Sequence, residues 1–171
     1  MIGRRSYDYL KAVYRLGGTP GAGCWVPVGQ VAEALGVSVP TASIMLRRLA
    51  ARGLLEVREG VGVRLTEEGF EALIEYLWKY GILEVAFVRA GLDPERAREA
   101  AASAADRLPR EVADALCSVL GEPRVCPHGK PIPRPGEEKP TGEPRLYCGV
   151  EPLKLTRLVA RAARRSSQAE A

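Results

Sequence analysis

The amino-acid sequence predicts a mainly α fold, made of a winged helix-turn-helix domain, a helical dimerisation domain and an irregular basic C-terminal tail. Two observations lead to this prediction. Two short amphipathic segments meet at Gly36 and precede two short strands around a glycine-bearing turn, and helical apolar periodicity then continues well beyond residue 66. We expect the three parts to cover residues 1–69, 70–133 and 134–171.

The segment from Ser38 to Leu49 has the signals of a well-defined helix. The Ser38 hydroxyl can cap its N-terminus, and Pro40 falls in the first turn, where a missing N–H costs nothing. One face is an apolar stripe of Ala42, Met45, Leu46 and Leu49. The opposite face carries hydroxyl groups, one apolar side chain and two guanidinium groups, from Thr41, Ser43, Ile44, Arg47 and Arg48.

A shorter amphipathic helix precedes this segment. It ends at Gly36, a residue type that tolerates the left-handed conformation after a helix, and its apolar positions are Val28, Val31, Ala32 and Leu35. Downstream, Gly53 ends the second helix, and residues 54–58 and 63–65 form strands on either side of a turn at 59–62. Two helices, a tight turn and a hairpin wing are typical of a DNA-binding unit.

The distribution of charge supports this interpretation. Residues 1–66 carry nine Lys/Arg and four Asp/Glu, residues 67–121 carry six and eleven, and residues 122–171 carry ten and six. Positive charge is therefore concentrated around the predicted helix-turn-helix, where DNA phosphates would lie. A helix-turn-helix used only for protein contacts needs no such excess of cations.

We therefore predict a sequence-specific binder of double-stranded DNA. Hydroxyl groups suit hydrogen bonds to base edges or phosphates, Ile44 suits a thymine methyl, and Arg47 can reach a guanine edge or a phosphate. Other arginines suit backbone phosphates. The predicted DNA-binding residues are Ser38, Pro40, Thr41, Ser43, Ile44, Arg47, Arg48, Arg52, Arg58 and Arg64.

Three helices are expected after the wing. Thr66 can cap the first, whose apolar face runs to Gly91 and contains Phe70, Leu73, Leu77, Leu83 and Phe87. The second opens at 93–95 and continues to about Leu108, and the third opens at Pro109 with a stripe of Val112, Leu116, Val119 and Leu120. We interpret the last two as a two-fold dimer interface that pairs half-sites of a palindromic operator. The alternative is packing onto the winged unit within a monomer.

The remaining composition sets further bounds. Residues 121–144 are rich in Pro and Gly and are expected to form an extended linker, followed by a short basic amphipathic helix around 153–165 that docks on the core or contacts flanking DNA. The chain has no apolar run of membrane-spanning length and no signal peptide, so we expect a cytoplasmic protein without membrane contact. Four cysteines are too few for a secreted disulfide framework and indicate free thiols or a metal site.

Cys126 and His128 flank Pro127, and this spacing suits two ligands of one metal. A residue before proline is driven to an extended conformation, and in an extended chain positions two apart point the same way. The thiolate and the imidazole can therefore share one metal, and these ligand types favour zinc over manganese or magnesium. The alternative is a buried apolar cysteine beside a histidine that donates to a turn.

Residues 6–133 resemble the diphtheria-toxin-repressor and manganese-transport-regulator family of metal-dependent transcriptional repressors. The resemblance is carried by the order and spacing of segments 6–14, 31–38, 40–43, 65–69, 91–93 and 126–133. It implies a winged-helix domain, a dimerising helical domain, and a divalent metal as corepressor of metal-uptake genes, with iron or manganese as the metal. Family members often carry a third, barrel-like domain, and the residues after Pro133 are too few and too Pro-rich to build one.

The resemblance also implies two metal sites. Asp8 matches a ligand of the primary site, but Ala102, Ala105 and Asp106 occupy its other positions, so this site is dismantled unless Asp106 or Glu99 substitutes. Tyr80 stands where the family has a histidine, whereas Glu84 keeps the family's carboxylate. The secondary site would comprise Glu84, Cys126 and His128, completed by Cys148 or Glu151.

The sequence thus favours a dimeric repressor linked to divalent-metal homeostasis. The alternatives are a DNA-binding regulator that needs no metal, a regulator that responds to zinc or to thiol oxidation, and a protein-interaction adaptor on the same scaffold. We predict no enzymatic activity, because the only imidazole, His128, lies beside Cys126 rather than aimed at it. Residues 17–23 also lack the lysine and hydroxyl pair of a phosphate-binding loop.

Overall fold

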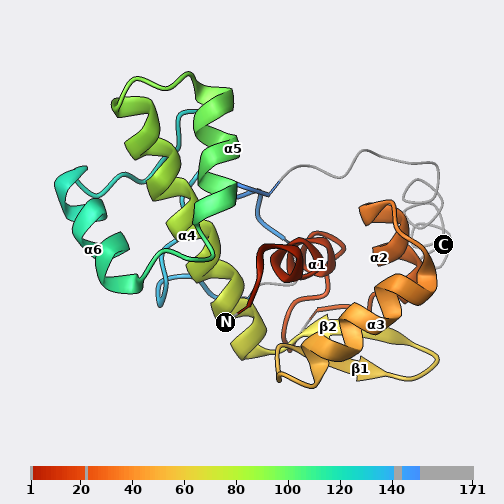
Figure 1. Ribbon diagram of the computed structural model, residues 1–171. Coiled ribbons are helices and arrows are strands. Elements are labelled where there is room, and N and C mark those ends of the chain that lie inside the picture. The colour runs from red at the N-terminus through yellow and green to blue at the C-terminus, as the bar shows by residue number, and fades with distance from the viewer. Residues whose placement is uncertain (1, 22, 141–143, 151–171) are drawn as a thin grey trace, which may run out of the picture.

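The computed structural model describes residues 2–21, 23–140 and 144–150. In these residues the fold is mainly α, as predicted, with one small antiparallel sheet. The elements are α1 (Arg4–Arg15), α2 (Val28–Leu35), α3 (Val39–Ala50), β1 (Leu55–Arg58), β2 (Gly62–Leu65), α4 (Glu67–Arg89), α5 (Pro94–Ala104) and α6 (Arg110–Val119). Figure 1 shows α1, α2, α3 and the hairpin on one side, α5 and α6 on the other, and α4 running between them.

The predicted helix-turn-helix is confirmed. Gly36 adopts a left-handed conformation with φ of 66° directly after α2. Ser38 caps α3, because its Oγ atom accepts a hydrogen bond of 3.3 Å from the backbone N–H of Thr41. The apolar stripe faces the core, with Ala42, Leu46 and Leu49 buried.

The wing is also confirmed. Strands β1 and β2 pair antiparallel, with Leu55 opposite Leu65 and Arg58 opposite Gly62. A further bridge from Val63 to Val26 joins the hairpin to the segment before α2. The hairpin is therefore anchored at its base by buried leucines and a third length of chain, while its tip at 59–61 is exposed.

Helix α4 connects the wing to the helical half of the molecule. Thr66 caps it by accepting from Gly69 N–H at 2.9 Å, and the same hydroxyl donates to the Gly53 carbonyl at 2.6 Å. The helix is buried along most of its length and packs against α1, α5 and α6. No helix of the described residues is long and apolar enough to cross a membrane.

Helix α5 is shorter than the sequence suggested. It ends at Ala104, and residues 105–107 form turns before α6 begins after Pro109. The expected end near Leu108 was wrong. Leu108 precedes Pro109, and a residue before proline is driven away from helical conformation, so the helix ends some residues earlier.

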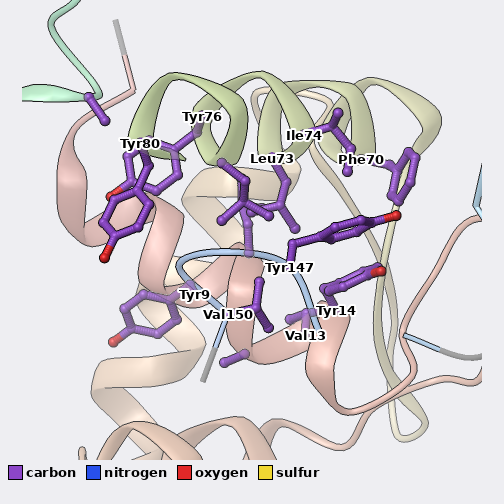
Figure 2. Packing of buried hydrophobic residues seen from close by; sticks show 14 of the residues in the cluster. Tyr9, Val13, Tyr14, Phe70, Leu73, Ile74, Tyr76, Tyr80, Tyr147 and Val150 are labelled. Carbon is purple, nitrogen blue, oxygen red and sulfur yellow. The ribbon is translucent and has the colours of Figure 1, made fainter. Parts of the chain in front are cut away.

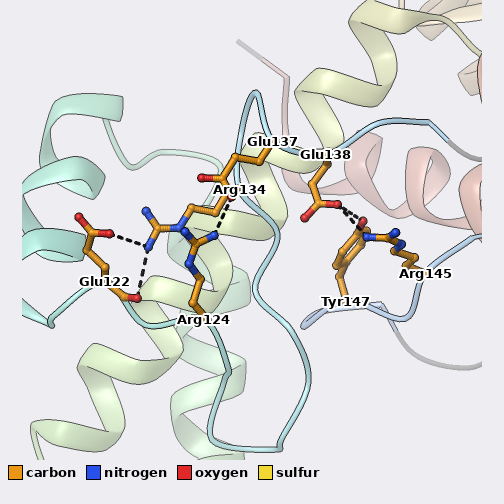
Figure 3. Close-up of polar contacts among 7 residues, drawn as sticks. All are labelled: Glu122, Arg124, Arg134, Glu137, Glu138, Arg145 and Tyr147. Atoms are coloured by element: carbon orange, nitrogen blue, oxygen red, sulfur yellow. Dashed lines mark hydrogen bonds and ion pairs between the residues drawn. The ribbon is translucent and has the colours of Figure 1, made fainter.

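The Pro/Gly-rich segment also differs from the expected extended linker. Residues 121–140 fold back on the helices: Cys126 and Ile132 are buried, and Ile132 packs where Gly81 of α4 has no side chain. Ion pairs join Arg124 to Glu137 and Arg134 to Glu122, as drawn in Figure 3. The composition suggested an unpacked linker, but buried apolar residues within it supply the packing energy. The basic helix expected at 153–165 lies outside the described residues.

Candidate DNA interface and metal centre

The predicted recognition surface is exposed. Ser38, Pro40 and Thr41 lie at the start of α3, and Ile44 is 57% exposed, unusual for an isoleucine. Between α3 and the wing lies a groove of about 360 Å³ lined by Ser43, Arg47 and Arg58, among others. The structure therefore places the residues of α3 and the wing tip along one open surface.

The other predicted arginines lie in different surroundings. Arg48 and Arg52 are exposed at the C-terminal end of α3. Arg64 is already engaged, because its Nε atom lies 2.7 Å from Glu56 Oε2 and its guanidinium stacks 4.6 Å from the centre of the Trp25 ring. The Arg64 side chain thus braces the hairpin, which the sequence did not indicate.

A cluster of potential metal ligands lies at the C-terminal half of α4. Glu84, Cys126 and His128 each offer one ligand atom, and these atoms all lie within 4.8 Å of one another. Glu84 is fully buried, and the turn at 126–129 is held by hydrogen bonds from Gly129 N–H to the Cys126 carbonyl and from Cys126 N–H to the Lys130 carbonyl. The three residues expected from the resemblance are therefore brought together.

Cys148 joins this cluster from a distant part of the chain. Its Sγ atom donates to Glu84 Oε2 at 2.8 Å, and its backbone N–H donates to the Pro131 carbonyl at 2.9 Å. Cys148 is buried. Of the two candidates for a fourth ligand, Cys148 contacts Glu84, and Glu151 lies outside the described residues.

The two thiols differ in protonation. The neighbouring Cys148 thiol lowers the pKa of Cys126 to about 6, assisted by the backbone N–H groups of His128 and Lys130 and opposed by burial. The neighbouring Cys126 thiol, burial and the Glu84 carboxylate raise the pKa of Cys148. At neutral pH, Cys126 is therefore a ready thiolate, and Cys148 holds a proton that a metal would have to displace.

The cluster fits a divalent metal. Glu84 Oε1 is buried and accepts no hydrogen bond within the described residues, although His128 Nδ1 lies only 2.6 Å away. An imidazole nitrogen and a carboxylate oxygen without a hydrogen-bond partner therefore lie side by side, and both are ligand types that zinc accepts. A fully buried carboxylate without a cation is costly, and a metal would remove that cost.

The residues at the primary-site position do not fit a metal. Asp8 pairs with Lys11 at 3.0 Å, and neither Asp8 nor Asp106 belongs to a group of three or more potential ligands in the described residues. The rings of Tyr7 and Tyr76 stack there, 4.1 Å apart, and Asp8 and Asp106 both act on the pKa of Tyr76. Burial raises the pKa of each of these tyrosines to about 12. An aromatic pair joins α1 to α4 at this position.

Sequence reasoning missed two features of the site. Glu95 on α5 lies 3.5 Å from His128 Nε2, so both imidazole nitrogens face carboxylates. The sequence signal for this contact was the acidic residue in the first turn of α5. An acidic residue there also stabilises a helix N-terminus, so it gave no specific indication of a contact with His128. The second is the contact between Tyr14 and the segment around Cys148, which is distant in sequence and had no local signal.

Comparison with known proteins identifies two family domains in the chain. Residues 1–63 match the model of the iron dependent repressor N-terminal DNA binding domain, and residues 66–134 match that of the iron dependent repressor metal binding and dimerisation domain. An uncharacterised HTH-type transcriptional regulator from Aeropyrum pernix is 45% identical over 157 residues, covering 90% of this chain and 87% of the relative.

Relatives of known regulatory type are matched by this chain over a smaller share of their length. The transcriptional regulator MntR of Escherichia coli O6:H1 is 39% identical over 86 residues, covering 50% of this chain and 56% of the relative. The crystal structure of ScaR with bound Zn²⁺ has 28% identity and a TM-score of 0.63, with 82% of this chain and 62% of that chain covered. ScaR is also described as a manganese-activated repressor.

The helix-turn-helix, the wing, the metal-ligand cluster on α4 and the two matched models therefore agree. The chain belongs to the iron-dependent repressor family of transcriptional regulators, with a DNA-binding domain followed by a metal-binding and dimerisation domain.

Proposed function

We propose that this protein represses its target genes when a thiophilic divalent metal is bound as corepressor. The preferred metal is zinc, and its ligands are Glu84, Cys126, His128 and Cys148. The observation that carries the proposal is the cluster of Glu84, Cys126 and His128, whose ligand atoms lie within 4.8 Å of one another, with Cys148 Sγ 2.8 Å from Glu84. Two sulfurs, one nitrogen and one carboxylate oxygen form a ligand set that suits tetrahedral zinc.

The choice of metal follows from ligand chemistry. Manganese and magnesium prefer sites made mostly of oxygen ligands, whereas this cluster offers one carboxylate and two thiols. The primary-site position offers the carboxylates of Asp8 and Asp106. Alanines stand at its other positions, and their methyl groups cannot bind a metal. Zinc bound to ScaR supports the idea that a family member can accept this ion. Iron or manganese remains the family's expected metal and is the competitor in the test.

The DNA contacts are proposed for α3 and the wing. The hydroxyl groups and Ile44 would enter the major groove, with Arg47 at a base edge or phosphate. Arg48, Arg52 and Arg58 would contact the phosphate backbone. Arg64 was expected to do the same, but its pairing with Glu56 favours a supporting role for it in the wing.

The apolar surface of α6 supports the proposed dimer interface. Val112 and Val119 of the predicted stripe are 41% and 83% exposed in the single chain. Exposed valines on one helix are expected to be covered by a partner, and family membership supplies the partner as a second copy. A two-fold dimer would place two α3 helices on the half-sites of a palindromic operator.

The proposal is tested by selecting duplexes from a random-sequence pool with zinc-loaded protein. Affinity for a selected duplex is then measured with zinc, iron(II), manganese or a chelator. We expect zinc to raise the affinity at least tenfold in the native protein and in Cys117→Ser, which alters a buried thiol outside the cluster. Cys126→Ser should abolish that response. Equal affinity under all conditions, or a manganese response that survives in Cys126→Ser, would reject the proposal.

A further inference from the structure

We propose that residues 145–150, which we call the strap, couple the metal centre to the DNA-binding domain, with Tyr14 of α1 as the receiving residue. The proposal rests on the metal site described above. It identifies how a metal bound there would change the affinity of the protein for DNA. The strap lies between α4 and α1, as Figure 2 shows for Tyr147 and Val150.

One side of the strap belongs to the metal cluster. Cys148 Sγ donates to Glu84 Oε2 at 2.8 Å, and the Cys148 N–H donates to the Pro131 carbonyl at 2.9 Å. The adjacent Gly149 has φ of 79°, and an added Cβ would lie 3.0 Å from the Tyr80 ring. The backbone of the strap therefore approaches α4 more closely than a residue with a side chain allows.

The other side of the strap lies against α1. The backbone N–H of Arg145 donates to the Tyr14 hydroxyl at 2.8 Å, and the ring of Tyr147 stacks on that of Tyr14 with 6.3 Å between centroids. Val150 is fully buried, and Figure 2 shows it beside Val13 of α1. Cys148 and Tyr147 are neighbours in the chain, so the ligand and the α1 contact belong to one short unit.

The far end of the strap is also fixed. The Tyr147 hydroxyl donates to Glu138 Oε2 at 2.6 Å, and the Arg145 guanidinium lies 3.5 Å from the same carboxylate, as seen in Figure 3. Both Tyr147 and Cys148 are almost fully buried. Within residues 145–150, a displacement of Cys148 is therefore expected to move the adjacent Tyr147 and to alter its packing on Tyr14.

Helix α1 can pass this change to the DNA-binding surface. It contacts α2, α3 and β2, which are the two helices of the helix-turn-helix and one strand of the wing. The alternative connection, a metal joining α1 to α5, lacks two of its ligands, because Ala102 and Ala105 stand at positions where the resemblance places them. Direct polar contact between α1 and α5 is instead a 3.4 Å hydrogen bond from Arg4 to Ser103. The strap thus provides a route from a metal to α1 that this chain retains.

The test uses Tyr14→Phe, which removes the acceptor of the Arg145 N–H but keeps the aromatic ring. Tyr9→Phe, a buried tyrosine of the same helix, is the matched control. Val150→Ala loosens the strap without altering a ligand. Cobalt(II) absorption measures loading of the metal centre, hydrogen–deuterium exchange measures protection of α1, and affinity for a selected duplex is measured with and without zinc.

We expect all three variants to give the native cobalt spectrum. In the native protein and Tyr9→Phe, metal should slow exchange in both the 126–132 turn and α1. In Tyr14→Phe and Val150→Ala, only the turn should respond. The gain in DNA affinity from zinc should fall about fivefold in Tyr14→Phe, the effect of losing one hydrogen bond, and by at least as much in Val150→Ala, which loses buried methyl groups.

Two contrary outcomes are distinguishable. If Tyr14→Phe and Val150→Ala bind cobalt and keep the full response of α1 and of DNA affinity, the strap is not the coupling element and the metal proposal stands. If the native protein shows no thiolate-to-cobalt band, the metal proposal fails and the coupling proposal fails with it.

Discussion

The Sγ atom of Cys148 lies 2.8 Å from Oε2 of Glu84, although 64 residues separate them in sequence. This contact brings a second thiol to a buried carboxylate that already faces His128. It supplies the proposed fourth ligand of the cluster formed by Glu84, Cys126 and His128, and residues 145–150 contact both α4 and α1.

Cys148→Ser is expected to weaken zinc binding by more than ~100-fold, because a direct ligand contributes more than outer-shell partners, whose loss costs about 10- to 100-fold. The measurement is competition with a chelator of known affinity, together with the cobalt charge-transfer band, which should lose about half its intensity when one of two thiolates is removed. Cys117→Ser should leave both unchanged. An unaltered affinity in Cys148→Ser would remove Cys148 from the ligand set.

Metal affinity is expected to rise with pH between about 7 and 8.5. Cys126, with its pKa lowered to about 6, is already a thiolate in this range, whereas Cys148, with its pKa raised, releases its proton only when metal binds. One released proton gives about a tenfold gain in affinity per pH unit. Calorimetry in buffers of different ionisation enthalpy counts the protons. In Cys148→Ser the proton count should fall by one, and an unchanged count would contradict the assignment.

Two arginines of the wing are expected to behave differently towards DNA. Arg58→Ala should lower the slope of log affinity against log salt by about 1, as for the loss of one phosphate contact. Arg64→Ala should leave the slope unchanged and lower the thermal stability of the wing, because Arg64 binds Glu56 and stacks on Trp25. Affinity titrations at several salt concentrations separate the two cases, and a reduced slope in Arg64→Ala would show that its pairing opens on DNA.

Val119→Asp is expected to dissociate the dimer. Val119 is 83% exposed in the single chain and lies on the apolar stripe of α6, so a carboxylate there would have to be buried in the proposed interface. Sedimentation equilibrium should show a monomer for Val119→Asp and a dimer for Ser118→Asp, an exposed position on the adjacent face of the same helix. A dimeric Val119→Asp would place the interface elsewhere.

Gly69→Ala is expected to destabilise the fold by about 2–3 kcal/mol. A Cβ at this position would overlap the backbone carbonyl of Leu54, where the start of α4 crosses the base of the wing. Gly29→Ala, in α2, meets no neighbouring atom and should stabilise the protein by about 0.5–1 kcal/mol. Urea unfolding measures both. Equal effects of the two substitutions would mean that the contact at Leu54 relaxes without cost.

The sequence alone determined the local structure of this protein. The Ser38 and Thr66 caps, the left-handed Gly36 and the hairpin turn are decided by residues within a few positions of each other, so their signals are visible in a short window. The grouping of Glu84, Cys126 and His128 was also predictable, but through family resemblance, since no local pattern joins α4 to a turn some forty residues later.

The tertiary structure alone decided how distant segments meet. In the tertiary structure, the Pro/Gly-rich residues 121–140 pack on α4, and Cys148 contacts Glu84. Arg64 is paired within the wing, and residues 145–150 pack against Tyr14. These contacts depend on burial and on the fit of surfaces far apart in the chain, and composition cannot report which surfaces will face each other. The physical reason is that capping and turn geometry are local, whereas packing is a property of the whole molecule.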